Sequence, residues 1–191
     1  MKNLAIYDFD GTLMNTPEKE EGKEIWKEKT GEEYPHRGWW GRRESLNTNI
    51  FDIQPISTIY FKKKKDIVNP NTYVIILTSR LEKLRPEVEN ILDIHGIEPD
   101  ELILKKGNET KGDVILSYVN KFPELKKIEV YDDFAGGMEY KIKEFTDIKN
   151  KLPEVIEYDV YYVDNKTGNY TLMESTNSIL NLIQEELRNL K

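Results

Sequence analysis

The sequence contains no cysteine and only two histidines, His36 and His95. Without a thiol, the chain cannot form disulfides or disulfide-linked partners, iron–sulfur clusters, thiolate zinc sites or a cysteine nucleophile. Two imidazoles are too few for a multi-histidine metal centre. His95 is expected in the last turn of a helix, where a histidine faces the helix dipole or the solvent.

Long apolar runs and a positive charge excess are also missing. No run approaches the roughly 20 residues of a membrane-spanning helix, and no signal peptide precedes the first predicted strand, so we expect a cytoplasmic protein without membrane contact. The net charge of −7 and the pI of about 5.1 provide no overall field that attracts nucleic acid. The 191 residues, 38% of them hydrophobic, suffice for a single domain with a core.

Segment 4–13 combines a predicted strand with two acidic residues. It begins as a short apolar run, which predicts a buried strand, and it ends in Asp8, Asp10 and Gly11. Open α/β sheets bind ligands beyond the carboxyl ends of their strands, where these two acids fall. Neighbouring carboxylates repel each other unless a cation or a shared proton neutralises them. An oxygen-rich site of this kind suits Mg²⁺.

Two other structures fit parts of this segment. Asp10-Gly11 is a strong hairpin-turn signal, but residues 15–20 supply no second alternating strand. An EF-hand loop needs its glycine at the sixth position and a glutamate at the twelfth, whereas Gly11 is the fourth residue counted from Asp8. We therefore favour a strand that leads into a ligand-binding loop.

Predicted strands and helices alternate along the rest of the chain, which indicates βαβ units and a parallel sheet. The fold class is therefore α/β, with a central, mainly parallel sheet. Further strands are expected at 73–77, 102–104 and 128–131, helices at 17–29, 56–67, 81–95, 110–119 and 138–149, a hairpin of 155–163 with 170–173, and a last helix at 179–190. The helix at 17–29 has Thr16 as its expected cap and a proline at its first position.

Polar side chains follow three of the predicted strands. Asp8 and Asp10 follow the first, Thr78 the second, and Asp132 and Asp133 the fourth. Because the carboxyl ends of parallel strands share one edge, these groups are expected to converge. Phosphoryl transfer uses such a set: a carboxylate nucleophile, an acid that protonates the leaving oxygen, a hydroxyl and an ammonium that hold the phosphoryl oxygens, and Mg²⁺.

Four motifs along residues 8–133 resemble, in order, those of the haloacid dehalogenase-like (HAD) phosphatases. They are the run Asp-x-Asp-Gly-Thr, Thr78, a lysine and the Asp132-Asp133 pair. The resemblance implies a HAD-like Rossmannoid three-layer sandwich and a Mg²⁺-dependent phosphomonoester hydrolase with an aspartyl-phosphate intermediate. It assigns Asp8 as nucleophile, Asp10 as general acid/base, Thr78 and Lys111 as the other catalytic groups, and Asp8, the Asp10 backbone carbonyl, Asp132 and Asp133 as metal ligands. Beside these groups, we expect the substrate to contact Gly11, Thr12, Ser79, Arg80, Trp39 and Trp40.

The third-motif lysine has three candidates. Lys111 fits the spacing best, while Lys105 and Lys106 are rivals at the end of the third predicted strand, and each of them is also explained as a solvated surface charge. Segment 107–113 has the glycine spacing of a P-loop. It lacks the Lys-Ser/Thr pair that contacts phosphate and Mg²⁺, so we reject a P-loop.

Within the superfamily, the sequence looks closest to the Swiss Army Knife RNA repair-like HAD group. The similarity lies in residues 13–17, Trp26, 38–41, 44–46 and 102–105, and it departs after Asp133, where Phe134-Ala135 stands in place of an expected Arg and nearby His. Residues 31–56 exceed what one crossover helix needs and are expected to form a small lid within a single HAD-like domain of residues 1–191. Residues 153–191 complete that domain as a hairpin and a helix.

The preferred substrate is a small phosphorylated molecule, such as a nucleotide, or a nucleic-acid end. The tryptophans at 39 and 40 are able to stack a base, or they pack the lid onto the domain. Lys62–Lys65 fit a nucleic-acid backbone or a solvated helix end. The alternatives are a non-catalytic protein that binds a phosphorylated ligand or nucleic acid, and a phosphotransferase. The oligomeric state stays open.

Overall fold

A six-stranded sheet forms the centre of the protein. The computed structural model describes residues 1–135 and 137–173 of the chain. The strand order is β3-β2-β1-β4-β5-β6, in which all neighbours are parallel except β5 and β6. The strands are β1 (Asn3–Tyr7), β2 (Thr72–Leu81), β3 (Glu101–Lys105), β4 (Lys127–Asp132), β5 (Glu157–Val163) and β6 (Tyr170–Leu172).

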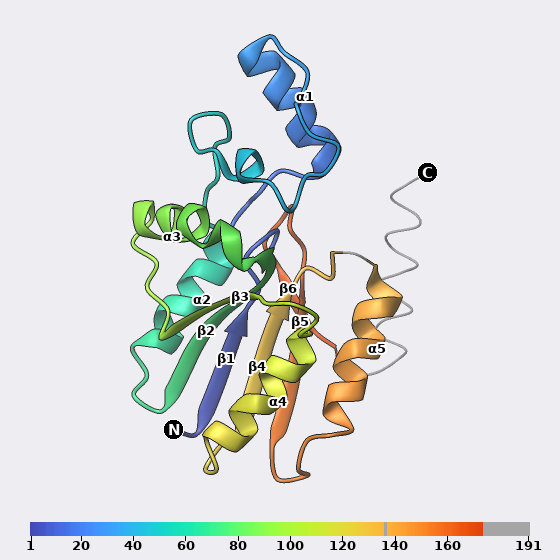
Figure 1. Ribbon diagram of the computed structural model, residues 1–191. Coiled ribbons are helices and arrows are strands. Elements are labelled where there is room, and N and C mark those ends of the chain that lie inside the picture. Colours follow the sequence, from blue (N-terminus) through green and yellow to red (C-terminus); the bar gives the residue numbers. More distant parts are fainter. Residues whose placement is uncertain (136, 174–191) are drawn as a thin grey trace.

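Helices cover both faces of this sheet (Figure 1). They are α1 (Lys19–Thr30), α2 (Ser57–Ile67), α3 (Arg85–Ile94), α4 (Lys111–Lys121) and α5 (Met138–Lys149), with short 3-10 turns η1 (Arg43–Leu46) and η2 (Glu82–Leu84). Side chains from α2 and α3 join one buried cluster and those from α4 and α5 another. This three-layer arrangement confirms the expected α/β class and is consistent with a HAD-like Rossmannoid fold.

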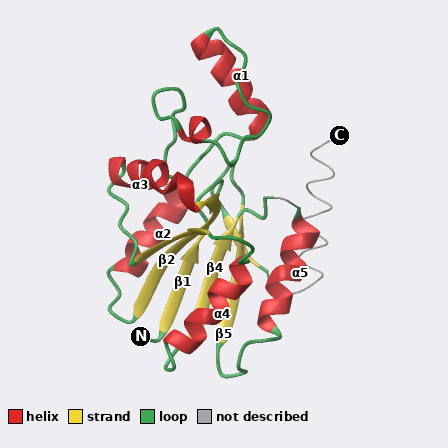
Figure 2. Cartoon of the chain, in the orientation of Figure 1, coloured by secondary structure: helices red, strands yellow, loops and turns green. Residues whose placement is uncertain are grey.

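The alternation of side chains along β1 explains the two cores. Ala5 and Tyr7 pack on the α2/α3 face, while Leu4 and Ile6 pack on the α4/α5 face, and all four are at most 2% exposed. A strand buried on both faces reads as a continuous apolar run, which is why segment 4–7 carries so clear a signal. Figure 2 shows β1 between β2 and β4 in the sheet, with helices in front and behind.

The topological switch point lies beside β1. The chain leaves β1 to form β2 and β3 on one side and then returns to form β4 on the other side. Tyr7 is in register with Ile76 of β2 and Tyr131 of β4. The residues that follow β1 and β4 therefore emerge next to each other, at the position where doubly wound sheets bind their ligands.

Three predicted boundaries are wrong, and one of them is the start of the helix expected at 81–95, which begins at Arg85 as α3. Helix α1 was expected from residue 17 with Thr16 as its cap, but it begins at Lys19, and Glu18 and Glu21 form the capping box. The Thr16 hydroxyl points to the active-site loop instead, where it donates to Asp10 Oδ1 at 2.9 Å. Strand β2 continues to Leu81, so Thr78 lies within the strand rather than after it.

Helix α1 and segment 31–56 project beyond the carboxyl edge of the sheet, where the lid was expected (Figure 1). The Trp39 indole anchors this part: it is 2% exposed, packs against Tyr34 and Phe51, and donates to the Pro17 carbonyl at 3.1 Å. Of the two interpretations of this tryptophan, its burial fits packing and not the stacking of a base. The division of the chain into one domain with a lid stays a prediction.

Gly22 of α1 offers a test of this packing. Replacing a helical glycine with alanine ordinarily stabilises a helix by about 1 kcal/mol. A Cβ on Gly22 would lie 2.2 Å from the Trp39 ring, so we expect Gly22→Ala to lower the free energy of unfolding by about 1–3 kcal/mol. Urea unfolding measures it. Gly38→Ala is the control, because no other atom lies within 4 Å of the position that its Cβ would take; equal stability of both variants would contradict the packing.

The end of the chain is described only in part. The expected hairpin is confirmed as the antiparallel pair β5 and β6, with Val163 opposite Tyr170. The helix expected at 179–190 lies outside the described residues. Within the described ranges, no helix has both the length and the apolar character needed to cross a bilayer.

Candidate active site

Three carboxylates meet at the switch point. Asp8 follows β1, Asp132 ends β4, and Asp133 comes next, and one carboxylate oxygen from each lies within 4.8 Å of the others. Asp8 and Asp132 are 9% and 1% exposed. Sequence spacing placed these acids at one edge of the sheet, and the structure brings them together there.

Lys111 stands among these acids. It is the first residue of α4, and its Nζ lies 2.9 Å from Asp8 Oδ1 and 2.7 Å from Asp132 Oδ2. The start of α4 is fixed by a capping box in which Thr110 and Asp113 bond each other's backbone amides. Lys105 and Lys106 are exposed. Of the three candidate lysines, the geometry favours Lys111.

The loop after β1 is held by backbone hydrogen bonds. The Asp8 amide donates to the Tyr131 carbonyl at 2.9 Å, and the Phe9 amide donates to Asp8 Oδ1 at 2.8 Å. Gly11 has φ +65°, and a Cβ on it would lie 2.2 Å from Asp133 Oδ2. Glycine is therefore required by both the backbone and the acid that approaches it. Thr12 is fully buried, and its hydroxyl has no hydrogen-bond partner among the described residues.

Burial and mutual repulsion perturb these acids. Burial raises the pKa of Asp8 to about 6, against the opposing effect of Lys111. Burial, together with the charges of Asp8 and Asp132, raises the pKa of Asp133 to about 8. Burial also acts on Asp132, but the Lys111 and Lys141 ammoniums outweigh it and hold the pKa of Asp132 below its usual value. The cluster therefore carries more buried negative charge than its lysines neutralise.

A hard divalent cation fits this donor set. All three groups offer carboxylate oxygens, the ligands that Mg²⁺ prefers, and the raised pKa values of Asp8 and Asp133 show that negative charge there lacks compensation. Asp8, Asp132 and Asp133 are the residues able to hold the ion. The side chain of Asp10 is engaged elsewhere.

Asp10, which is partly exposed, forms an ion pair with the buried Arg80. The guanidinium donates to both Asp10 oxygens at 2.8–3.2 Å and also to the Trp40 carbonyl and Ser45 Oγ. The Arg80 side chain is 1% exposed, and its guanidinium carbon lies 4.9 Å from the centre of the Trp40 ring. Arg80 thus links the sheet to segment 31–56. No local pattern in the sequence indicates this pair, because its members are 70 residues apart.

A cavity of about 300 Å³ opens over the carboxylates. It is lined by Asp8, Asp10, Glu18, Trp40, Ser79, Arg80, Lys111, Asp133, Ala135 and Lys141. Trp40 is 38% exposed, so of the two tryptophans it is the one placed to contact a substrate. Thr78 is 1% exposed and lines an adjoining cavity with Ser79 and Lys111. Its oxygen accepts from the Arg80 amide, which leaves the hydroxyl proton free to donate.

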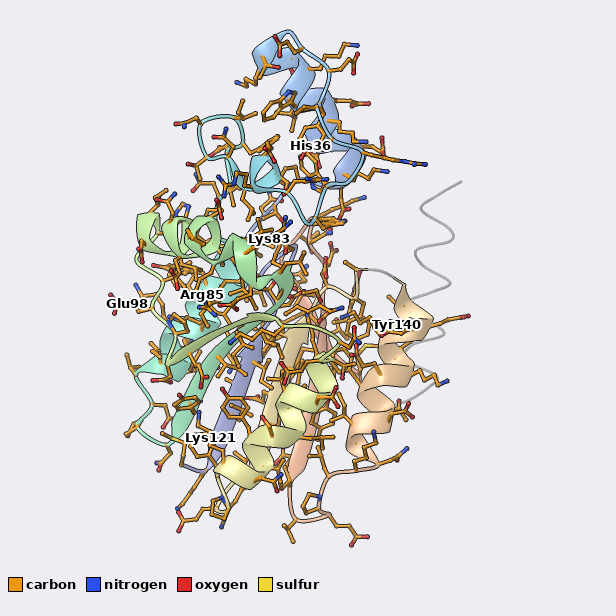
Figure 3. The ribbon with its side chains drawn as sticks, viewed as in Figure 1. His36, Lys83, Arg85, Glu98, Lys121 and Tyr140 are labelled. Carbon is orange, nitrogen blue, oxygen red and sulfur yellow. The ribbon has the colours of Figure 1, made fainter. Side chains whose placement is uncertain are left out.

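Lys141 belongs to the site although the sequence analysis missed it. It lies on α5, is 7% exposed, and its Nζ is 3.4 Å from Asp132 Oδ2 and 3.7 Å from Glu144 Oε2. Figure 3 labels its neighbour Tyr140 on α5, near the carboxyl ends of the strands. The only sequence signal was a lysine between apolar positions of a predicted helix, which is not specific.

Comparisons with known proteins give distant similarities. No family model matches the chain. An uncharacterized protein of Saccharomyces cerevisiae is 26% identical over 157 residues, a match that covers 68% of this chain and 34% of the yeast protein. The chain therefore spans about a third of that relative. The HAD domain of effector protein Lem4 from Legionella pneumophila aligns with a TM-score of 0.43 and 14% identity, over 98% of this chain and 95% of that domain.

Proposed function

We propose that the protein is a Mg²⁺-dependent phosphomonoester hydrolase that acts through an aspartyl-phosphate on Asp8. The observation that carries the proposal is the position of Lys111, whose ammonium contacts both Asp8 and Asp132 beside Asp133 and at the wall of a cavity. A buried carboxylate paired with an ammonium, next to further acids that suit a cation, is what nucleophilic attack on a phosphoryl group requires.

Each group has a task in this proposal. The Asp8 oxygen attacks phosphorus and displaces the leaving oxygen, and water later attacks phosphorus to release phosphate from Asp8. Lys111 and the Thr78 hydroxyl stabilise the charge on the phosphoryl oxygens. Asp10 protonates the leaving oxygen and then takes a proton from the incoming water. Mg²⁺, when bound by Asp8, Asp132 and Asp133, supplies positive charge that lowers the repulsion between these acids and the phosphate.

The proposed substrate class is a nucleotide or a nucleic-acid end. Trp40 supports it, because an exposed indole at the cavity is able to stack on a base. The lysine run of α2 does not support a nucleic-acid track. Lys62 is paired with Asp66 and Glu129, and Lys63 is 3% exposed and donates to the Glu98 carbonyl.

One observation favours a second candidate, a non-catalytic protein that binds a phosphorylated ligand. Asp10 accepts hydrogen bonds from Arg80 and Thr16, so its carboxylate has to leave this ion pair before it transfers a proton. A binding protein needs no such release. This candidate predicts Mg²⁺-dependent binding of phosphate esters without phosphate release.

Phosphate release separates the two candidates. We expect release from at least one member of a panel of an aryl phosphate, mononucleotides, and 3′- and 5′-phosphorylated oligonucleotides, with Mg²⁺ present. EDTA should reduce it to background, and added Mg²⁺ should restore it, because the three carboxylates need a cation. Release that is unaffected by EDTA would contradict the role of Mg²⁺. Binding without release would favour the second candidate, and transfer of phosphate to an added alcohol would reveal a phosphotransferase.

A further inference from the structure

A second cavity, of about 290 Å³, adjoins the one over the carboxylates. The two cavities share Ser79, Lys111, Ala135 and Lys141. The second cavity extends between the ends of β2 and β3 and the first turns of α4 and α5, and its lining includes the apolar side chains of Leu77, Ile103, Leu104 and Val114. A substrate whose phosphate lies at Asp8 has this space directly beside it, across the shared wall.

The two cavities differ in charge. Four carboxylates and three cationic side chains line the cavity over Asp8. In the adjoining cavity, Lys105, Lys111 and Lys141 face only two carboxylates, those of Glu109 and Glu144. The adjoining cavity is therefore the more positive of the two, and an anionic group is better accommodated there than a neutral or cationic one.

Lys141 lacks the short contacts that the other two buried cations of the site make with their acids. Arg80 and Lys111 contact their acids at 2.7–2.9 Å, the usual range for charge-assisted bonds. Lys141 has contacts of 3.4 and 3.7 Å, although its ammonium carries three donors and its side chain is 9% exposed. A buried charge without a short partner is costly, and an anion at the shared wall would complete its coordination.

We propose that Lys141 binds a second anionic group of the substrate, a phosphate or carboxylate on the leaving group, which occupies the adjoining cavity. This inference rests on the proposed function and narrows its substrate class to phosphomonoesters with two anionic groups. Lys111 serves the phosphoryl group at Asp8, and Lys141, with help from the exposed Lys105, serves the second anion. The shared wall makes Lys141 a determinant of specificity.

The test compares matched substrates. Adenosine 3′,5′-bisphosphate is set against adenosine 3′-monophosphate and adenosine 5′-monophosphate, and 3-phosphoglycerate against glycerol 3-phosphate, so the two arms distinguish a second phosphate from a carboxylate. We expect Lys141→Met, which keeps the aliphatic stem, to raise KM about tenfold or more for at least one substrate with two anionic groups. KM for its counterpart should change less than about twofold. Lys105→Met should act in the same direction with a smaller effect.

Two controls make the result decisive. Lys143→Met removes an exposed lysine from the same helix and should leave every KM unchanged. Calorimetric binding of adenosine 3′,5′-bisphosphate and 3-phosphoglycerate to Asp8→Asn, with and without Lys141→Met, measures the second-anion contact even if the protein releases no phosphate. The inference is overturned if Lys141→Met weakens substrates of both kinds equally, or none, or if calorimetry shows no loss. Absence of phosphate release alone overturns only the proposed hydrolysis.

Discussion

Asp8→Asn is expected to reduce phosphate release by at least about 10⁴-fold, because an amide oxygen cannot replace a carboxylate as the nucleophile. The substitution keeps the size of the side chain and the acceptor for the Phe9 amide, so the fold should persist. It also removes a buried carboxylate that is repelled by the neighbouring acidic groups. The free energy of unfolding, measured without Mg²⁺, should therefore not fall by more than about 1 kcal/mol.

The intermediate itself gives a second readout for the same variant. After a rapid acid quench of a reaction with phosphorus-labelled substrate, wild-type protein should carry the label and Asp8→Asn should not. Asp93→Asn, an exposed aspartate on α3, is the matched control and should behave as wild type in both assays. If the Asp8→Asn protein still becomes labelled, or if it releases phosphate as fast as the wild type, Asp8 is not the nucleophile.

The elements that the sequence predicted well are those whose signals are local. The apolar run before Asp8 is buried on both faces of the sheet. A short apolar run of this kind predicts a strand from its own sequence, whatever elements pack against it. Thr110 caps α4 because the capping box needs only Thr110 and Asp113. Spacing favoured Lys111 over its rivals, and this cap fixes the start of the helix that carries Lys111.

The features that the sequence did not predict depend on partners far along the chain. Thr16 belongs to a residue type that caps helices well, but its hydroxyl donates to Asp10 instead. Helix α1 begins at Lys19, two residues later than the expected Pro17. Lys141 lies near Asp132 only because α5 packs beside β4 and β5. Neither outcome follows from local propensity, since each is decided by a contact that exists only in the folded chain.

Arg80→Leu is expected to lower the free energy of unfolding by about 3 kcal/mol or more. The Arg80 guanidinium is buried and satisfies Asp10, the Trp40 carbonyl and Ser45 Oγ together. Removing it leaves a carboxylate and two polar groups without their donor, which costs more than the pair itself contributes. Arg43→Leu removes an arginine that is 70% exposed and should cost less than about 1 kcal/mol. Urea unfolding at one pH measures both.

A double-mutant cycle identifies the cause of that loss. If the unpaired Asp10 charge is responsible, Asp10→Asn should recover part of the stability lost in Arg80→Leu, with a coupling energy above about 1 kcal/mol. If Arg80 acts only by holding segment 31–56 through Trp40 and Ser45, the two losses should add. Additivity would therefore show that Asp10 does not depend on Arg80, and the ion pair would then be no obstacle to proton transfer by Asp10.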